Sequence, residues 1–378
     1  MSCKPEPDPN PVLPDLTIRD SDVFERDEPA RMLFEVVALD SVAIPIDFTY
    51  QIIPVTAEPD VDFVLANGSG TIEAGNRSVN IEVQILGDDL NEMDEKLIVT
   101  ITSASNAKLV DSTGTGVIVD DDAPVPTDAD GYITAESIYG YDLVWQDEFD
   151  GTELDPASYN IDIGDGCPNL CGWGNDEKQW YTDDPSNLRL EDGKMILTAT
   201  KTGTSDYQSA RVQTKGKKEF KFGRIDIRAK LPKGQGIWPA IWMLGQNIDD
   251  VGWPACGEID IMELVGHQPK TVHGTAHWGP QGRGYSTYST SSYFIDQDFQ
   301  EAFHVFSLVW ELNQMVWYVD ETRFKTITSK DMQGETYRFN QDFYFIFNIA
   351  VGGRWPGLPD ETTVFPQTME IDYVRVFQ

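Results

Sequence analysis

The sequence predicts an all-β protein built from two sandwich domains, on three observations. Short runs rich in Val, Ile, Thr, Phe, Tyr and Trp recur along most of the chain, and Gly, Asn, Asp and Pro separate them. Strands do not alternate with helical patterns, which argues against a parallel α/β sheet. A Pro-rich break near residue 123 divides the 378 residues, a length that suffices for two cores.

The first predicted domain is a β-sandwich over residues 16–122. Runs such as "RMLFEVVAL", "SVNIEVQIL" and "KLIVTITSA" have the length and turn spacing of strands. Residues 1–15 are acidic and Pro-rich and are predicted to be a disordered tether. Residues 123–139, which begin "APVPTDADG", have the composition of a linker.

The second predicted domain, residues 140–378, is a large antiparallel β-jelly-roll sandwich with a concave cleft. Its strand-like runs include "FGRIDIRAKL", "FHVFSLVWE", "FYFIFNIAVGG" and "MEIDYVRVF". A long series of such runs without intervening helices is typical of this architecture.

The charge of the chain limits its partners. The net charge is −35, from 28 basic and 63 acidic residues, so a nucleic acid or an anionic membrane surface would be repelled. The first 125 residues hold 25 acidic and 7 basic residues, which suits divalent-cation sites as well as solubility. No apolar run reaches the roughly 18 residues that a membrane-spanning helix needs.

The four cysteines divide into three kinds. Cys167 and Cys171 lie in the tight loop "DGCPNLCGWG" and are candidates for a small-loop disulfide in an exported protein. Cys256 is expected to be a small buried residue. Cys3, in an acidic Pro-rich start, resembles the lipid-bearing cysteine of a bacterial lipoprotein, although an accidental cysteine is the alternative. We therefore expect a secreted protein or a cell-surface or outer-membrane lipoprotein of a bacterium.

The stretch "GEIDIMELVG", residues 257–266, carries three acids in an apolar run. On a regular strand Glu258 and Asp260 share a face, and Glu263 falls on the opposite one. If Met262 is the extra residue of a β-bulge, all three point into one cleft. Glycosidic cleavage with retention requires such a set, because one carboxylate attacks while another carboxyl group donates a proton. The alternative is a half-buried strand with stray acids, which desolvation disfavours.

Tryptophans cluster around these acids in the sequence. Trp238, Trp242 and Trp253 come shortly before them, and Trp173 and Trp180 flank "GNDEKQ". Sugar rings present apolar C–H faces that aromatic rings cover well. A single Trp is more often part of the core, but the clustering favours a sugar-binding cleft.

Residues 140–378 resemble glycoside hydrolase family sixteen, and within it the bacterial laminarinases, which are endo-β-1,3-glucanases. The resemblance rests on "KFGRIDIRAKLPKGQGIWPAIWMLG", "WPACGEIDIMELVGH", "HGTAHWGP" and "NIAVGGRWPGLPD". It implies that Glu258 is the nucleophile, Glu263 the general acid/base and Asp260 an assisting carboxylate. It also implies that His277 is a cleft histidine, with a purely structural histidine as the alternative.

The same resemblance implies further sites. Glucan contacts are expected at Asn175, Arg211, Trp238 and Trp242; Ala210 stands where Gly is more common before that arginine. A structural calcium ion on the convex side is expected to use main-chain oxygens and one Asp, and the matching positions are Glu148, Gly193 and Asp372. Alternatively, Asp372 pairs with a basic neighbour.

The first domain resembles a Calx-beta domain, through "GSGTIEAGNRSVNIEVQILGDDLNEMDEKLIVTIT" and "GVIVDDD". This resemblance implies a calcium site at one end of the sandwich, because Ca²⁺ takes six to eight oxygen ligands. The alternative is that these acids only solvate loop tips. The candidate ligands are Glu25, Asp62, Asp88, Glu92, Glu95, Asp120, Asp121 and Asp122.

Together these observations predict a monomeric, retaining endo-hydrolase of β-1,3-glucan that needs no cofactor for catalysis and carries structural Ca²⁺. The same fold acting on mixed-linkage glucan or a marine galactan is one alternative. Lichenase-type members have the shorter "EIDIE" strand, which disfavours them here, whereas galactanases also use a bulged strand. A non-catalytic glucan-binding protein is the other alternative.

Overall fold

The computed structural model confirms the all-β fold class. Its described residues are 13–25, 29–40, 42–88, 94–120, 127–134, 138, 141–204, 206–282, 286–332 and 334–378. Cys3, Glu92, Asp121 and Asp122 lie outside them. The chain divides into two compact units, Met1–Pro124 and Val125–Gln378. Among the described residues, no helix has the length and apolar character needed to cross a membrane.

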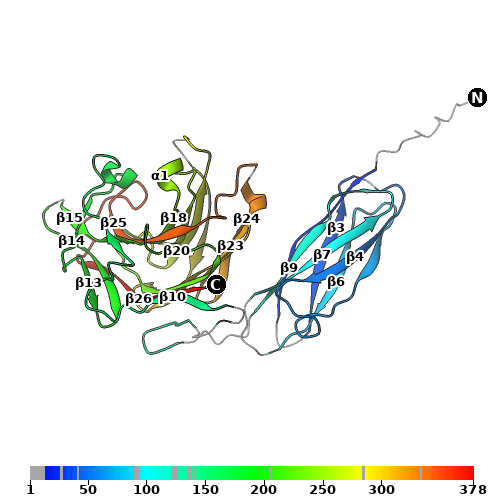
Figure 1. The fold of residues 1–378 in the computed structure, drawn as a ribbon, viewed down its shortest axis with the longest axis horizontal. Helices are drawn as coiled ribbons and strands as arrows, with labels where there is room; N and C mark the ends of the chain where they lie inside the picture. The colour runs from blue at the N-terminus through cyan, green and yellow to red at the C-terminus, as the bar shows by residue number, and fades with distance from the viewer. Residues whose placement is uncertain are drawn as a thin grey trace, which may run out of the picture. The chain divides into compact units, whose positions relative to one another are not determined.

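The first unit is a two-sheet sandwich (Figure 1). Its core lies between the sheets and includes Leu16, Phe34, Phe48 and Leu97, all almost fully buried. One sheet has the order β6(Ser78–Ile85), β3(Ala30–Ala38), β1(Asp15–Ile18), β8(Lys108–Asp111). The other has the order β2(Ser21–Phe24), β9(Thr113–Val119), β7(Glu95–Ala104), β4(Ile46–Pro54), β5(Gly68–Ile72).

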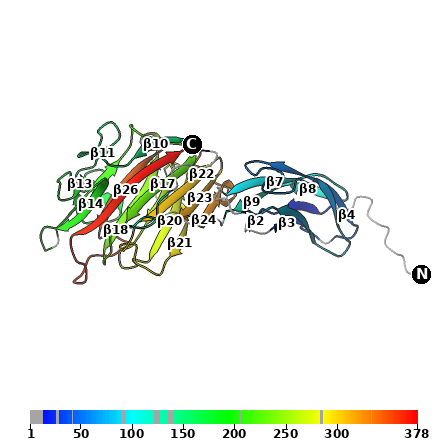
Figure 2. The same ribbon diagram turned by 90° about the horizontal axis from the view of Figure 1, so that it is seen from below.

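The second unit is a larger sandwich of a ten-stranded and a seven-stranded sheet, here called the outer and the inner sheet. Figure 2 shows their long strands running side by side. The outer sheet has the order β12(Gln179–Tyr181), β15(Tyr207–Ser209), β14(Lys194–Lys201), β26(Gln367–Phe377), β17(Gly223–Lys230), β22(His304–Glu311), β23(Gln314–Val319), β24(Thr322–Thr328), with β10(Leu143–Asp147) on β26 and β13(Leu188–Glu191) on β14.

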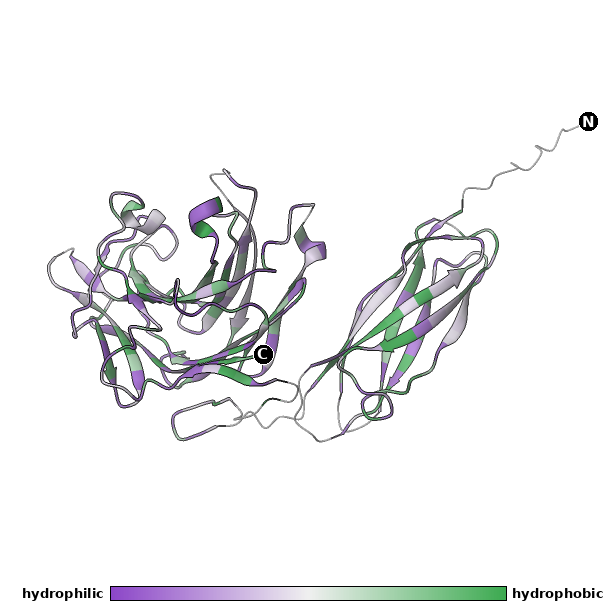
Figure 3. Cartoon of the chain, in the orientation of Figure 1, coloured by the Kyte–Doolittle hydropathy of each residue, from purple (hydrophilic) through white to green (hydrophobic). Residues whose placement is uncertain are grey.

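The inner sheet has the order β11(Asn160–Ile161), β16(Arg211–Gln213), β25(Phe343–Val351), β18(Ile237–Gly245), β19(Glu258–Glu263), β20(Thr271–Trp278), β21(Thr287–Phe294). The described part of this unit also contains three one-turn helices: η1(Cys171–Gly174), α1(Ile248–Val251) and η2(Ser329–Met332). Figure 3 shows hydrophobic and hydrophilic bands alternating along many strands, as expected when one face of each strand is buried.

One face of the inner sheet packs on the main core, and the opposite face, here called the cleft face, is where the predicted cleft would lie. Along β18, Ile237, Ile241 and Met243 belong to the main core between the sheets. Trp238 and Trp242, which alternate with them, are only partly buried and lie on the opposite face. The period of two therefore places both predicted sugar-binding tryptophans on the face of the sheet turned away from the core.

Part of the expected linker is packed against the second unit. Within 123–139, Asp128 accepts a 2.7 Å hydrogen bond from Arg228 Nη2, and Gly131 forms a β-bridge with Phe303. The main-chain N–H of Thr134 donates to the hydroxyl of Tyr373. Residues 127–134, which lie within the predicted linker, are thus held by the outer sheet.

Candidate active site

A β-bulge on β19 resets the facing of its side chains, as the spacing of the acids predicted. Against β18, Trp242 pairs with Asp260 and Ile241 pairs with Met262, which leaves Ile261 as the extra residue. Against β20, Asp260 pairs with Thr275 and Glu263 pairs with His273, so Ile261 and Met262 together oppose one residue.

Both residues of this bulge are buried in the main core, which breaks the alternation between Asp260 and Glu263. Met262 was the predicted extra residue, and the register assigns that place to Ile261. The consequence for the acids is the same. Glu258, Asp260 and Glu263 lie on the cleft side of one strand, within the electrostatic reach of one another.

The three carboxyl groups hold their protons more tightly than exposed acids do. Burial raises the pKa of Glu258 to about 7, against the lowering effect of a hydrogen bond from Trp253. Burial also raises the pKa of Glu263 to about 7; the charge of Glu258 adds to this, and nearby His277 opposes it. For Asp260, burial and the charges of both glutamates raise the pKa well above its ordinary value. Such a cluster can hold a proton on one carboxyl group while another is ionised near neutral pH.

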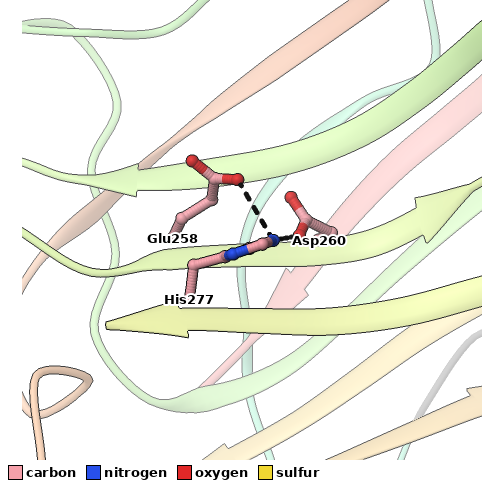
Figure 4. A group of neighbouring side chains, drawn as sticks. All are labelled: Glu258, Asp260 and His277. Atoms are coloured by element: carbon pink, nitrogen blue, oxygen red, sulfur yellow. Dashed lines mark ion pairs between the residues drawn. The ribbon is translucent and has the colours of Figure 1, made fainter. Parts of the chain in front are cut away.

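His277, on the neighbouring strand β20, joins two of these acids (Figure 4). Its Nε2 lies 3.4 Å from Asp260 Oδ2 and 3.7 Å from Glu258 Oε1. A ring nitrogen of His277 and one carboxylate oxygen from each acid, the atoms that could bind a metal ion, all lie within 4.8 Å of one another. His277 Nδ1 is 3.0 Å from Ser286 Oγ. Burial lowers the pKa of His277, against the raising effect of the Glu263 charge, so the ring is neutral near pH 7 and lies against the acids without adding a fixed positive charge.

Indole N–H groups hold the two glutamates. Trp253 Nε1 donates to Glu258 Oε2 over 2.8 Å, and Trp238 Nε1 donates to Glu263 Oε1 over 3.2 Å. An indole N–H can only donate, so each carboxyl oxygen that faces it accepts. The other oxygen of Glu258, Oε1, faces His277.

The sequence did not single out one aromatic neighbour of this site, Trp355, and it left a second, Trp253, without a specific role. Trp355 meets Trp238 edge-on with ring centroids 5.5 Å apart, and it meets His273 at 5.1 Å. Trp253, which the sequence placed only in the cluster near the acids, is 42% exposed, so its ring presents a face to solvent while its N–H holds Glu258. The motif "GGRWPG", which contains Trp355, was the available signal for it.

A lysine from the outer sheet also reaches the site. Lys325, on β24, is 4% exposed; its Nζ donates to Ser289 Oγ of β21 over 2.8 Å and lies 5.3 Å from the centroid of the Trp317 ring. Trp317 in turn donates from Nε1 to the main-chain oxygen of Asp260 over 2.9 Å. The Lys325 charge opposes the rise in the Asp260 pKa, and no sequence motif signalled this role.

Arg211 lies between two tryptophan rings beside the acids. Its guanidinium carbon is 4.4 Å from the ring centroid of Trp173 and 4.9 Å from that of Trp242, and its Nε pairs with Asp162 Oδ2 at 2.9 Å. Cys167 and Cys171 form a disulfide in the loop that carries Trp173. The structure therefore brings Arg211 and Trp242 together as expected, and it adds Trp173 to them.

The remaining predicted cleft residue, Asn175, follows η1 in the same loop. Its side-chain amide donates to Glu177 Oε1 over 3.2 Å, and its main-chain oxygen accepts from the N–H of Arg354. All five predicted substrate-contact residues thus belong to the inner sheet or to the loop that leads into β12.

The expected calcium site on the convex side is engaged by arginines. Asp372 Oδ2 accepts from Arg228 Nη1 over 2.6 Å, and the Glu148 carboxylate accepts two bonds from Arg375, of 2.8 and 3.0 Å. The main-chain oxygen of Glu148 lies near Gly193, as a shared main-chain site would require. The Arg228 contact matches the alternative in which Asp372 pairs with a basic neighbour, so this calcium site stays a prediction.

The predicted calcium ligands of the first unit are partly buried and partly outside the described residues. Glu25, Asp62 and Glu95 are each less than a tenth exposed, which is rare for acids. In the part of this unit that the structure describes, no three acidic groups bring oxygens within 4.8 Å of one another. Asp88 and Asp120 are also described, but the cluster stays a prediction because Glu92, Asp121 and Asp122 are not.

Comparison with protein families agrees with this geometry. The model of glycosyl hydrolases family 16 matches residues 174–375, which is more than half of the chain and includes every acid of the cluster. A second model, described as beta-glucan synthesis-associated protein SKN1/KRE6/Sbg1, matches residues 79–259.

Individual relatives point the same way. The chain is 38% identical over 269 residues to the glucan endo-1,3-beta-glucosidase A1 of Niallia circulans, covering 66% of this chain and 39% of that protein. It is 38% identical over 250 residues to the beta-glucanase of Rhodothermus marinus, covering 63% of this chain and 85% of that protein. The laminarinase catalytic domain of Thermotoga maritima MSB8 is 48% identical with a TM-score of 0.59, covering 63% of this chain and 98% of that domain.

Proposed function

Because the chain belongs to family 16 of the glycosyl hydrolases, we propose that it is an endo-acting, retaining β-1,3-glucanase of the laminarin-degrading type. The observation that supports this most directly is the bulge at Ile261 and Met262, which brings Glu258 and Glu263 to the cleft face of one strand. Without it, the two groups would face opposite sides of the sheet and could not act on one bond.

The proposed reaction is a double displacement. Glu258, ionised, attacks the anomeric carbon while Glu263 gives its proton to the departing glycosidic oxygen. Glu263, now ionised, takes a proton from water, whose oxygen attacks the same carbon and releases Glu258. The raised pKa of Glu263 suits its first role, because the group keeps its proton at a pH where an ordinary glutamate has lost it.

Asp260 and His277 support this exchange. Asp260 lies between the two glutamates on the strand and raises the electrostatic cost of a second negative charge there. His277, neutral, contacts both Asp260 and Glu258 and can follow their change in protonation without adding a fixed charge. We assign both as residues that tune the pair, with Glu258 and Glu263 reacting.

Replacing Glu258 by Gln tests the assignment. The amide cannot form the glycosyl ester, so kcat on laminarin should fall by about 10³-fold or more, while binding of laminarin, measured by calorimetry, persists. The exposed Glu191→Gln variant is the matched control. An E258Q variant that keeps more than about a hundredth of the activity would show that another group is the nucleophile.

Substrate choice separates the alternatives. Reducing ends released from laminarin, lichenan and agarose distinguish a β-1,3-glucanase from a mixed-linkage glucanase and from a galactanase. The higher identity to a glucan endo-1,3-beta-glucosidase and to a laminarinase catalytic domain favours the first. A protein that binds laminarin but releases no reducing ends would be the non-catalytic glucan-binding alternative.

We also propose a setting for the enzyme. The Cys167–Cys171 disulfide supports export to an oxidising compartment, and attachment through a lipid on Cys3 remains our proposal for its anchoring. We further propose that the first unit is a Calx-beta-like spacer stiffened by Ca²⁺ and that the enzyme is a monomer. A rise in the melting temperature of the full chain on adding Ca²⁺, reversed by a chelator, tests the metal, and size-exclusion chromatography with light scattering tests the monomer.

A further inference from the structure

Glu177 is a buried acid that the proposed reaction does not use. It lies between η1 and β12, and burial raises its pKa. Two side-chain amides donate to it: Asn175 Nδ2 lies 3.2 Å from Oε1, and Gln179 Nε2 lies 2.6 Å from Oε2. Gln179 must present its nitrogen to Glu177, because its own oxygen accepts from the main-chain N–H of Val351 over 2.7 Å.

A chain of hydrogen bonds with a fixed direction runs from Trp242 to Tyr181, which lies near Glu177. Trp242 Nε1 can only donate, so the atom of Asn348 that faces it over 2.8 Å is the carbonyl oxygen Oδ1. Asn348 Nδ2 then donates to the hydroxyl of Tyr181 over 3.1 Å. The Tyr181 hydroxyl, having accepted there, keeps its own hydrogen to donate, and it lies near Glu177, whose charge adds to burial in raising the pKa of Tyr181.

The far end of this chain lies in the cleft. Trp242 pairs with Asp260 in the strand register, and its ring packs against the guanidinium group of Arg211. Tyr181 is fully buried and Asn348 is 5% exposed, so water does not substitute readily for a missing link. The charge of Arg211 also lowers the pKa of Glu177. Glu177 is therefore linked both to Arg211 and to the Trp242 ring that packs against it.

We propose that Glu177 is a positioning residue for the substrate-binding face of the cleft. This inference rests on the proposed function. The Glu177 carboxylate acts through Tyr181 and Asn348 to hold the indole of Trp242 in place, and the glucan binds against that indole. Donors meet both of its oxygens, so the site accepts a carboxylate and excludes an isosteric amide, whose N–H would face another N–H or O–H.

Glu177→Gln tests this inference, with the exposed Glu191→Gln as the matched control. The first measurement needs no substrate: the indole N–H resonance of Trp242, assigned from its loss in Trp242→Phe, should shift in E177Q and stay in place in E191Q. The second is kinetic: KM for laminarin should rise about tenfold in E177Q, with kcat largely retained. A purely structural role would instead lower the melting temperature and the active fraction without a selective rise in KM.

A double-mutant cycle tests the route. Tyr181→Phe should reproduce the indole shift and part of the rise in KM, and E177Q combined with Y181F should raise KM by less than the product of the single effects. An unmoved Trp242 resonance in both single variants, or independent effects on KM, would overturn the inference. If the wild-type chain released no product from laminarin, the proposed function would fail, and the indole resonance would still decide the role of Glu177.

Discussion

The acids of the two sheets in the second unit have different partners. In the outer sheet, Asp226 is fully buried and pairs with Arg224 Nε at 2.7 Å. Asp372 and Glu148 are likewise paired with arginines of strands β17 and β26. Burial raises the pKa of Asp226, and the charge of Arg224 and its hydrogen bond oppose that rise, which gives the pair a structural role.

In the inner sheet, Glu258, Asp260 and Glu263 share one strand and meet indole N–H groups and a neutral imidazole in place of arginine pairs. Their pKa values are raised by burial and, for Asp260 and Glu263, by the charge of their neighbours. Such an arrangement costs stability at neutral pH, and reaction chemistry is the physical reason to retain it. Asp226, Asp372 and Glu148 thus differ from the three acids of β19 in being paired with arginines.

The largest expected effect comes from removing the proton donor of the inner sheet. Glu263→Gln should lower kcat on laminarin by about 10²–10⁴-fold, because an amide does not protonate the leaving oxygen. On an aryl β-glucoside whose leaving group needs no proton, the first step should be much less impaired. Steady-state and burst kinetics on both substrates measure this, and equal losses on the two would contradict the role of general acid.

Breaking a pair in the outer sheet should affect stability alone. Arg224→Met leaves Asp226 buried without its main partner, so the free energy of unfolding should fall by about 3–5 kcal/mol. Urea unfolding measures the loss, and kcat of the folded variant should be unchanged. Arg189→Met, which breaks an exposed pair with Glu191, is the control and should cost at most about 1 kcal/mol. A loss no larger than in the control would contradict the contrast between the sheets.

Removing a charge from the inner sheet should raise the stability of the protein, whereas breaking a pair in the outer sheet should lower it. The pKa of Glu258 rises from 4.5 to about 7 on folding, so above pH 7 the folded state carries a charge that burial penalises, and below pH 4.5 the group is neutral in both states. Glu258→Gln should therefore raise the melting temperature at pH 8 by about 2–4 °C, with the gain shrinking as the pH falls toward 4. Differential scanning calorimetry across this range checks the trend, and a gain that grows toward low pH would contradict it.

The smallest expected effect concerns the lysine that links the sheets. The charge of Lys325 lowers the pKa of Asp260, so Lys325→Met should make the acid cluster ionise at higher pH. The acidic limb of the kcat/KM profile should then move upward by less than about one pH unit. Ser289→Ala, which keeps the charge and removes its hydrogen-bond partner, should move the limb less. A shift to lower pH in Lys325→Met would contradict the proposed influence.

Much of the site could be predicted because it lies within one short segment. The spacing of Glu258, Asp260 and Glu263 around two apolar residues predicts a bulge from strand geometry alone, and the register confirms one. The choice of Ile261 rather than Met262 as the extra residue depended on the hydrogen-bonding partners supplied by β18, which the local sequence does not specify.

Residues that act from a distance could not be predicted. Trp355, Lys325 and Glu177 reach the site from a loop, from the outer sheet and from the segment before β12, and no spacing in the sequence links them to β19. Likewise, the composition of 123–139 predicted a linker but gave no sign that residues 127–134 contact Arg228 and Tyr373, more than ninety residues away in the chain.

By itself, the sequence determined the all-β class, the pattern of buried and exposed faces along the strands, and the acid motif, because each depends on residues a few positions apart. The tertiary structure alone decided which acids meet arginines and which do not. A pKa depends on the charges and the burial that surround a group in space, and those neighbours come from strands far apart in the chain. The difference between a structural acid such as Asp226 and a reactive one such as Glu258 is therefore made by the packing of the two sheets.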